Sequence, residues 1–558
     1  MNDSAEQLAQ TISRHAVAHP KRDAIIFLER GEAETERVTY EELEARVASY
    51  AAGFENEGFG GRVVAIALPT GPAFISLFLG CLRAGAIAVP VPLPDSDRST
   101  QRVAAVLSDA QPSAVITTKS EIPKLVAIAG TSPVIDNELL LGSNTSAPCF
   151  TADRPALIQY TSGSTRAPKG IVITHANLMA NQHMIRQAFG LPIGVIGATW
   201  LPHFHDMGLI GTILQPLFLG GTAIVMPPRA FVQKPIRWLR AIARYGAHTA
   251  GAPSFGYELC TRTIGSDDAA GLDLSSWQRA FCGAEPVRAN VLELFAQRFA
   301  AAGFDEKAFV PCYGLAETTL ITAASDPGQG LKVRDIARGA DAPRRYVSCG
   351  KAVEGSTILL RDEDGRKATL GEICVGGPHV SPGQWDGKRG EVVPFDNILA
   401  ENGQTYLRTG DLGTFIDGEL MVVDRIKDIL VLYGAKHHAM DIEMSALDSH
   451  PDIRAAAAFA VDDGQRERLV VLCEIDRRKL AAVERPAFTR DVAKNISEAI
   501  GVLPTVEMIA YGDLPRTSSG KIQRFAAKTK FLSGVWGVSN VNFGAAISPA
   551  SDERSEQT

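Results

Sequence analysis

Short apolar runs alternate with longer amphipathic stretches over roughly the first 420 residues, and this alternation limits the folds available to the chain. The runs Val63–Leu68, Ala86–Val91 and Ala114–Thr117 are almost wholly apolar and predict buried strands. Helical stretches separate them, and one begins at Thr39, where Glu42 completes a capping box. This rhythm indicates an α/β architecture with parallel sheets.

The pattern changes near residue 424, after a stretch rich in Gly and Asp. Beyond it, Ala455–Val461 and Leu469–Ile475 predict strands, and residues 489–500 predict a helix. We therefore expect a large domain with several subdomains at 1–424, a small mobile α+β domain at 425–535, and a polar, disordered tail at 536–558.

Composition excludes several classes of protein. The chain has 558 residues, of which 45% are hydrophobic and 21% charged, as in an ordinary globular protein. A net charge of -7 argues against nucleic acid as the main partner. The eight cysteines lack CxxC spacing, so neither a zinc site nor a redox dithiol is predicted. We expect a cytoplasmic protein, because the cysteines suit a reducing compartment and the polar N-terminus lacks a signal-peptide core.

The most membrane-like run spans residues 208–226, but Pro216 and the pair Gly220–Gly221 interrupt it. We interpret it as a buried helix, a turn and a buried strand, and we expect no integral membrane association.

Tyr160–Gly170, with the sequence YTSGSTRAPKG, joins two apolar runs and is the first motif with chemical content. Its backbone N–H groups and hydroxyls can wrap phosphate oxygens, and Lys169 adds a cation. The sequence is not that of a Walker A loop, because Lys169 is preceded by Pro168 rather than Gly and is not followed by Ser or Thr. The alternative is a plain hairpin turn.

Trp200–Gly211, with the sequence WLPHFHDMGLIG, carries two imidazoles followed by flexible and apolar residues. His203, His205 and Asp206 could suggest a metal site, but Met207 stands where the hydrolase pattern HxHxDH requires Asp. We favour the mouth of a pocket for an apolar acid. The alternative is a histidine pair satisfied in a core turn.

Two further motifs carry single side chains suited to a nucleotide. In PCYGLAETT (311–319), Tyr313 offers a ring for a base and Glu317 a hard oxygen for Mg²⁺. In RTGDLG (408–413), Asp411 can accept both hydroxyls of a ribose. Neither motif is specific alone. A surface Glu explains the first equally well, and an Asx-turn explains the second.

Two motifs lie near and beyond the predicted boundary. Asp424–Glu443 has flanking charges, an apolar run and a Gly turn, which suit a hinge or a solvated linker. In LPRTSSGKIQR (514–524), small hydroxylated residues and Gly520 deliver Lys521 on a mobile loop, although an exposed basic turn would look the same.

Together, these six segments resemble the adenylate-forming superfamily of acyl-CoA synthetases, peptide-synthetase adenylation domains and luciferases, over about residues 10–530. The resemblance implies a large N-terminal domain, a small mobile C-terminal domain and an active site between them. It also implies roles for individual residues. ATP would be bound by Thr161, Ser162, Gly163, Ser164, Thr165, Lys169, Gly170, Gly283, Ala284, Glu285, Tyr313, Gly314, Asp411 and Arg425. Lys521, His205 and Glu317 would be catalytic, Glu317 and Thr165 would hold Mg²⁺, Lys427 would be the hinge, and His205, Asp206, Met207, Gly208 and Ser254 would contact the acid.

Within the superfamily, the chain looks most like the fatty acyl-AMP ligases. LPHFHDMGLIG, GAPSFGYELC (251–260) and FCGAEPVR carry this likeness, and residues 325–346 lie where that branch has an insertion. Ala439–Met440 departs from the branch, which commonly has Tyr-Pro there.

The resemblance implies an ATP- and Mg²⁺-dependent ligase that converts a fatty acid to acyl-AMP with release of pyrophosphate. We expect the acceptor to be a separate acyl carrier protein, or a carrier domain of a polyketide or peptide synthase, because the stretch after Arg524 is short of the roughly 70–80 residues of a four-helix carrier. An acyl-CoA synthetase is the alternative. A non-catalytic acyl- or nucleotide-binding relative is disfavoured, since Lys521, Glu317, Asp411 and the phosphate loop are all present.

Overall fold

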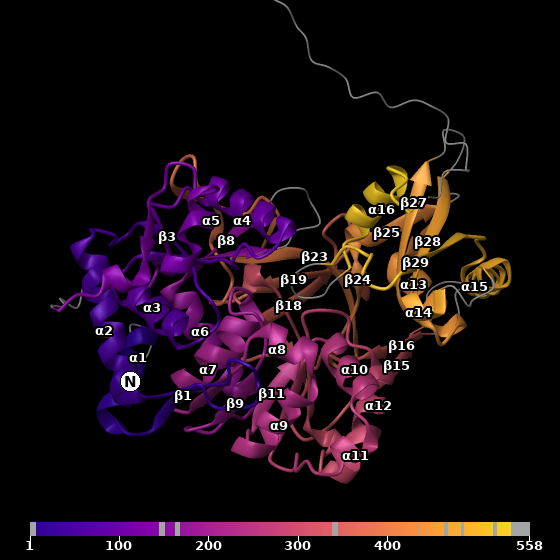
Figure 1. Cartoon of the computed structure of the whole chain (residues 1–558). Coiled ribbons are helices and arrows are strands. Elements are labelled where there is room, and N and C mark those ends of the chain that lie inside the picture. Colours follow the sequence, from indigo (N-terminus) through magenta and orange to yellow (C-terminus); the bar gives the residue numbers. More distant parts are fainter. Residues whose placement is uncertain are drawn as a thin grey trace, which may run out of the picture. The chain divides into compact units, whose positions relative to one another are not determined.

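The computed structural model describes residues 7–143, 151–161, 168–336, 344–432, 435–462, 467–480, 485–516 and 522–536 (Figure 1). The described residues divide into two compact units, with the change from the first to the second at Val423–Asp424.

The first unit contains a nine-stranded sheet. Its order is β17 (Lys351–Ala352), β14 (Ile321–Ala324), β13 (Phe309–Gly314), β12 (Arg279–Cys282), β11 (Thr249–Ala252), β9 (Ile196–Thr199), β10 (Thr222–Val225), β1 (Asp23–Phe27) and β2 (Glu36–Thr39). The strands from β13 to β1 run parallel, and antiparallel strands close both edges.

A second sheet of the first unit has eight strands and contains the three strands predicted from apolar runs. Its order is β21 (Glu391–Val393), β20 (Gly383–Asp386), β8 (Lys169–Thr174), β7 (Pro155–Thr161), β4 (Ile87–Pro90), β3 (Val63–Ala67), β5 (Ala114–Thr117) and β6 (Val134–Asp136). The part from β7 to β6 is parallel, whereas β8, β20 and β21 are antiparallel. The α/β prediction is confirmed, with mixed rather than purely parallel sheets.

The third sheet is antiparallel. Its strands are β18 (Thr357–Arg361), β19 (Leu370–Gly376), β23 (Gln404–Ile416) and β22 (Ile398–Glu401), and β24 (Glu419–Arg425) pairs with β23. In the stretch interpreted as an insertion, β15 (Val333–Ile336) pairs with β16 (Arg344–Val347). Arg345 of this hairpin forms an ion pair of 2.6 Å with Glu293 of α12 (Ala289–Phe299).

Helices cover the two large sheets. They include α1 (Leu8–Ala18), α2 (Tyr40–Asn56), α3 (Pro72–Arg83), α4 (Asp97–Ala110), α6 (His175–Ala188), α9 (Ile236–Tyr245), α10 (Ser254–Thr263) and α12 (Ala289–Phe299). The capping box predicted for α2 is present, since Glu42 Oε2 accepts the Thr39 amide at 2.8 Å and Thr39 Oγ1 accepts the Glu42 amide at 3.3 Å. In magenta in Figure 1, α9 packs against β9 and α10 against β11.

The second unit is built on the sheet β27 (Ile453–Asp462), β28 (Glu467–Ile475) and β29 (Thr505–Ala510). Alternate residues of β27 enter different cores: Ala456 and Ala458 join one, Ala457 and Phe459 the other. One core contains α13 (Ala439–Ser449) and α15 (Arg485–Ile500), and the other contains α16 (Arg524–Leu532). The sheet is therefore covered on both faces, which is typical of a small α+β domain.

The run at residues 208–226 forms the predicted helix, turn and strand. The helix begins as a π-helix, η4 (Met207–Leu214), continues as α7 (Gln215–Phe218), and is followed by β10. Among the residues that the structure describes, we find no helix with the length and apolar character needed to span a membrane.

Candidate functional site

Two of the predicted nucleotide motifs of the first unit lie where parallel strands end. Tyr313 and Gly314 end β13, and Gly283 directly follows its neighbour β12. The two strands are in register, with Cys282 opposite Pro311, so both loops leave the same edge of the sheet. A Cβ added to Gly283 would lie 2.9 Å from the Cys312 carbonyl oxygen, so this position has little room for a side chain.

Tyr313 and Asp411 form a buried side-chain pair. The Tyr313 hydroxyl donates to Asp411 Oδ2 at 2.8 Å, across 98 residues of sequence. Asp411 lies within β23, and its amide donates to Thr409 Oγ1 at 3.1 Å. The structure therefore brings together the two side chains that were predicted separately to contact adenine and ribose. Those two roles remain predictions.

Glu317 lies in a short 3₁₀ turn that is attached to the strand after the phosphate loop. The Ser381 amide donates to the Glu317 carbonyl oxygen at 2.9 Å, and Ser381 Oγ donates to the Val172 carbonyl oxygen of β8 at 2.6 Å. One small core joins this turn, β8 and β23 through Ile171, Ala316, Phe395 and Leu407. Ser381 thus holds two predicted motifs together, and no motif in the sequence singled it out.

Two residues of these loops adopt left-handed backbone conformations that side chains other than glycine rarely take. Ala284 has φ 67° and Thr319 has φ 64°. Such strain costs about 1–3 kcal/mol per residue and tends to occur at functional sites. Thr319 Oγ1 donates to the His379 carbonyl oxygen at 2.7 Å, which helps to hold the strained turn after Glu317.

Thr161 and Lys169 form the last residue pair of β7 and β8 before the residues that connect the two strands. The loop residues Ser162, Gly163, Ser164 and Thr165 lie outside the described residues, so their assignment to phosphate binding remains a prediction. Gly170 is required sterically, because a Cβ there would lie 2.7 Å from Ile158 Cγ2.

Four of the five predicted acyl-binding residues, His205 to Gly208, lie at the start of the π-helix. Asp206 Oδ1 lies 2.6 Å from His205 Nδ1 and also accepts the Met207 amide at 2.6 Å, so it orients the imidazole and caps the helix. A Cβ on Gly208 would lie 2.1 Å from the Pro202 carbonyl oxygen. One on Gly211 would lie 2.9 Å from the Leu320 side chain, so this helix passes close to the turn that contains Glu317. π-Helical segments often occur at functional sites.

Ser254 and Glu285 organise the start of α10. Ser254 Oγ accepts the Arg288 amide at 3.2 Å, and Glu285 Oε1 accepts the Phe255 amide at 2.8 Å. Both residues therefore have clear structural contacts, and their predicted contacts with acid and adenine remain predictions.

The remaining predicted residues belong to the second unit. Arg425 ends β24, and Lys427 lies in the 3₁₀ turn Ile426–Asp428, with both side chains exposed. Lys521 lies outside the described residues, between the described residues Arg516 and Ile522.

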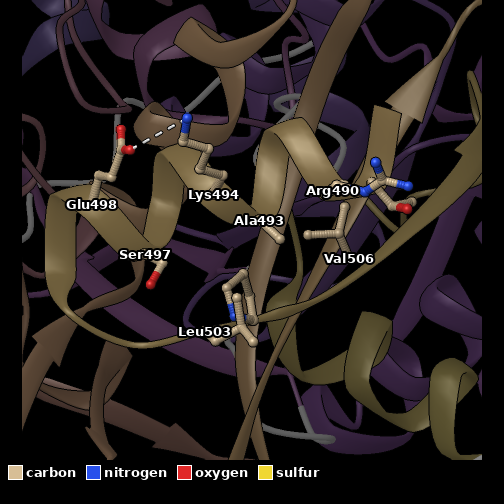
Figure 2. A pocket seen from close by; sticks show the side chains of 9 residues that line it. Arg490, Ala493, Lys494, Ser497, Glu498, Leu503 and Val506 are labelled. Atoms are coloured by element: carbon tan, nitrogen blue, oxygen red, sulfur yellow. Dashed lines mark ion pairs between the residues drawn. The ribbon is translucent and has the colours of Figure 1, made fainter. Parts of the chain in front are cut away.

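A surface hollow of about 660 Å³ lies on α15 and the segment before β29 (Figure 2). Its lining is Thr489, Arg490, Ala493, Lys494, Ser497, Glu498, Leu503, Pro504 and Val506, none of which is a predicted site residue. Lys494 Nζ lies 3.8 Å from Glu498 Oε1 on its rim, as the dashed line in Figure 2 shows.

Because three histidines are buried, we expect the free energy of unfolding to fall in mild acid. Burial lowers the pKa of His203 to about 3, and the pKa of His175 and of His379 to about 4. The unfolded chain takes up these protons below about pH 6.5, whereas the folded chain does not until each lower pKa. We therefore expect the free energy of unfolding to fall on acidification below about pH 6.5, by up to about 1.4 kcal/mol per pH unit for each histidine.

Urea unfolding at several pH values measures this slope. A His203→Asn variant should lose about one histidine's share of it, whereas a variant of the exposed His19, His19→Asn, should keep the wild-type slope. An unchanged slope in His203→Asn would contradict the assignment.

Comparisons with known proteins show which family this chain is similar to. The family model described as AMP-binding enzyme matches residues 12–385. A medium-chain-fatty-acid–acyl-carrier-protein ligase of Moorena producens is 36% identical, over 92% of this chain and 93% of the relative. A 4-hydroxyphenylalkanoate adenylyltransferase of Mycobacterium tuberculosis is 34% identical, over 95% and 92%. A solved structure from work on fatty acyl-adenylate ligases of E. coli and L. pneumophila superposes with a TM-score of 0.84 at 31% identity, over 95% of this chain and 98% of that one.

Proposed function

Because this chain belongs to the AMP-binding enzyme family, we propose that it activates a fatty acid as acyl-AMP and passes the acyl group to a separate acyl carrier protein. The chain is an adenylate-forming ligase, and ligases of this class use ATP. The observation that best supports the proposal is the meeting of distant motifs in the first unit, where Tyr313 bonds to Asp411 and the Glu317 turn is attached to β8.

In this proposal, the Tyr313–Asp411 pair holds the nucleoside. The ring of Tyr313 packs on adenine beside Gly283–Glu285, and the carboxylate of Asp411 accepts the ribose hydroxyls, with Arg425 supporting them. The hydrogen bond from Tyr313 supports this role, because it orients the Asp411 carboxylate before any ligand binds. The phosphates are held by the loop from Thr161 to Thr165, with Lys169 and Gly170.

Adenylation is an in-line substitution at the α-phosphorus. A carboxylate oxygen attacks, the bond from phosphorus to the bridging oxygen breaks, and pyrophosphate leaves. No proton is transferred, so the protein contributes positioning and charge neutralisation. Lys521 supplies the positive charge for the carboxylate and the α-phosphate. The hard oxygens of Glu317 and Thr165 suit Mg²⁺, which, when bound, would offset charge on the phosphates.

The acid is held by the segment that leads into the π-helix, and we propose that it is a fatty acid. Leu209, Ile210, Ile213 and Leu214 of this helix belong to the main hydrophobic core. The likeness to a relative named for medium-chain fatty acids supports an alkyl chain as the substrate. His205, oriented by Asp206, lies at the start of the helix, where we place the carboxylate end of the substrate. Ser254 contributes from the start of α10.

In the second step, the thiol of the carrier's phosphopantetheine loses its proton and its sulfur attacks the acyl carbon. The bond from that carbon to the AMP oxygen breaks, and AMP leaves. The likeness to a relative named for ligation to acyl carrier protein supports this acceptor.

The experiment is a two-stage assay by mass spectrometry with purified protein, ATP and Mg²⁺. Medium- and long-chain fatty acids and a hydroxyphenylalkanoic acid are offered first, and acyl-AMP is measured. The best acid is then offered with a phosphopantetheinylated carrier protein or with CoA. We expect a fatty acyl-AMP and transfer to the carrier. Preference for the aromatic acid would overturn the substrate class, and efficient acyl-CoA formation would overturn the acceptor.

A further inference from the structure

The described residues on either side of residues 517–521 are fixed within the second unit. Arg516 and Ile522, the described residues on either side of residues 517–521, form an antiparallel bridge. The Gln523 amide also donates to the Pro515 carbonyl oxygen at 2.8 Å. The two ends of this short segment are therefore held side by side.

The N-terminal end is attached to the sheet by Arg516. Its guanidinium lies 2.7 Å from Glu474 Oε2, and Glu474 is completely buried in β28. Glu474 Oε1 accepts the amides of Gly512 and Leu514, each at 2.9 Å. One buried carboxylate thus fixes this end of the segment.

The C-terminal end is attached by Arg524, three residues after Lys521. Its Nε lies 2.7 Å from Glu443 Oε1, and one of its terminal nitrogens lies 2.7 Å from Glu443 Oε2; Glu443 belongs to α13. Its other terminal nitrogen lies 2.5 Å from Asp428 Oδ2. Asp428 directly follows Lys427, the predicted hinge, so Arg524 connects the Lys521 segment to the chain beside the hinge.

The stability of α16 does not explain an arginine at this position. Arg524 is the first residue of α16, and the positive end of a helix dipole disfavours a cation there. Glu443 is buried, and it also accepts the Ala458 amide at 2.9 Å. A two-pronged contact to a buried carboxylate sets direction as well as distance, which a lysine could not do equally well.

We propose that Arg524 is a positioning residue for Lys521: by joining the Lys521 segment to Asp428 and Glu443, it sets where the lysine lies in the second unit. This inference rests on the proposed role of Lys521 in adenylation. It gives the turn Ile426–Asp428, α13 and the start of α16 one common anchor. The alternative is that the ion pairs of Arg524 with Glu443 and Asp428 only stabilise the fold of the second unit.

Rates of acyl-adenylate formation distinguish a positioning role of Arg524 from a purely stabilising one. We expect Arg524→Gln to lower kcat by roughly 10- to 100-fold, as for a catalytic group displaced by about 1 Å, and to change KM for ATP less than about threefold. Arg524→Lys should fall between the wild type and Arg524→Gln, because it keeps the charge and loses the fork. Lys479→Ala, which breaks the ion pair with Asp452 elsewhere in the unit, is the matched control and should keep wild-type rates.

The deciding measurement repeats Arg524→Gln in a Lys521→Ala background. If Arg524 acts through Lys521, adding Arg524→Gln to the Lys521→Ala enzyme should lower the remaining rate of acyl-adenylate formation by less than about twofold. The same factor in both backgrounds, or a folded Arg524→Gln enzyme with wild-type kcat, would overturn the inference. Wild-type turnover by Lys521→Ala alone would instead remove the proposed role of the lysine itself.

Loss of a buried ion-pair partner can also prevent folding, so thermal unfolding is measured for each variant. If Arg524→Gln does not fold, Asp428→Asn replaces it, because this change leaves the Arg524–Glu443 contact intact. We expect it to lower kcat about three- to tenfold, and to have less than about a twofold effect once Lys521 is alanine. Equal factors in the two backgrounds, or no effect on kcat, would overturn the inference here as well.

Discussion

Replacing Lys521 by alanine should lower the rate of acyl-adenylate formation by about 100- to 1000-fold, with little change in ATP binding. In the proposed mechanism, the lysine offsets charge on the attacking carboxylate and the α-phosphate, and this charge is concentrated in the transition state. A contact made mainly in the transition state lowers kcat more than it raises KM. Single-turnover formation of acyl-AMP, together with the dissociation constant of ATP, measures both quantities.

The exposed Lys530 of α16 provides a matched control close by in the sequence, and Lys530→Ala should retain the wild-type rate. A Lys521→Ala enzyme that turns over normally would remove this lysine from the mechanism. Loss of ATP binding with a normal rate at saturation would move it to ground-state binding.

Replacing Asp411 by alanine should raise KM for ATP by roughly 10- to 100-fold, and lower kcat much less. A hydrogen bond to a charged group contributes about 1.5–3 kcal/mol, and the ribose contact is the same before and during the reaction. The structure adds a second consequence, because the buried Tyr313 hydroxyl loses its acceptor at 2.8 Å. Initial rates over a range of ATP concentrations give both constants.

Two variants test the cause of the Asp411 effect. Tyr313→Phe removes the hydroxyl and leaves the carboxylate, so it should raise KM for ATP less than Asp411→Ala does. Asp417→Ala changes an exposed carboxylate close by in the sequence and should leave KM unchanged. An unchanged KM in a folded Asp411→Ala enzyme would contradict the ribose assignment.

The elements predicted from sequence are those with strong local signals. Val63–Ala67 and Ala114–Thr117 are strands because their uninterrupted apolar side chains must be buried on both faces of a sheet. The helix at Tyr40 begins where the Thr39 capping box satisfies its first amides. The antiparallel strands β8, β20 and β21 had no comparable signal, because strand direction depends on which neighbour a strand meets.

The candidate site likewise has features that the sequence predicts and features that only the folded structure determines. Tyr313, Glu317 and Asp411 could be predicted as site residues from their motifs, because their side-chain chemistry and the order of the motifs are properties of the sequence. The sequence does not determine that Tyr313 bonds to Asp411, or that Ser381 joins the Glu317 turn to β8. These contacts join residues far apart along the chain, so they exist only once the sheets have packed. The link from Arg524 to Asp428 and Glu443 has the same origin, since only the folded second unit brings the start of α16, the turn Ile426–Asp428 and α13 within hydrogen-bonding distance.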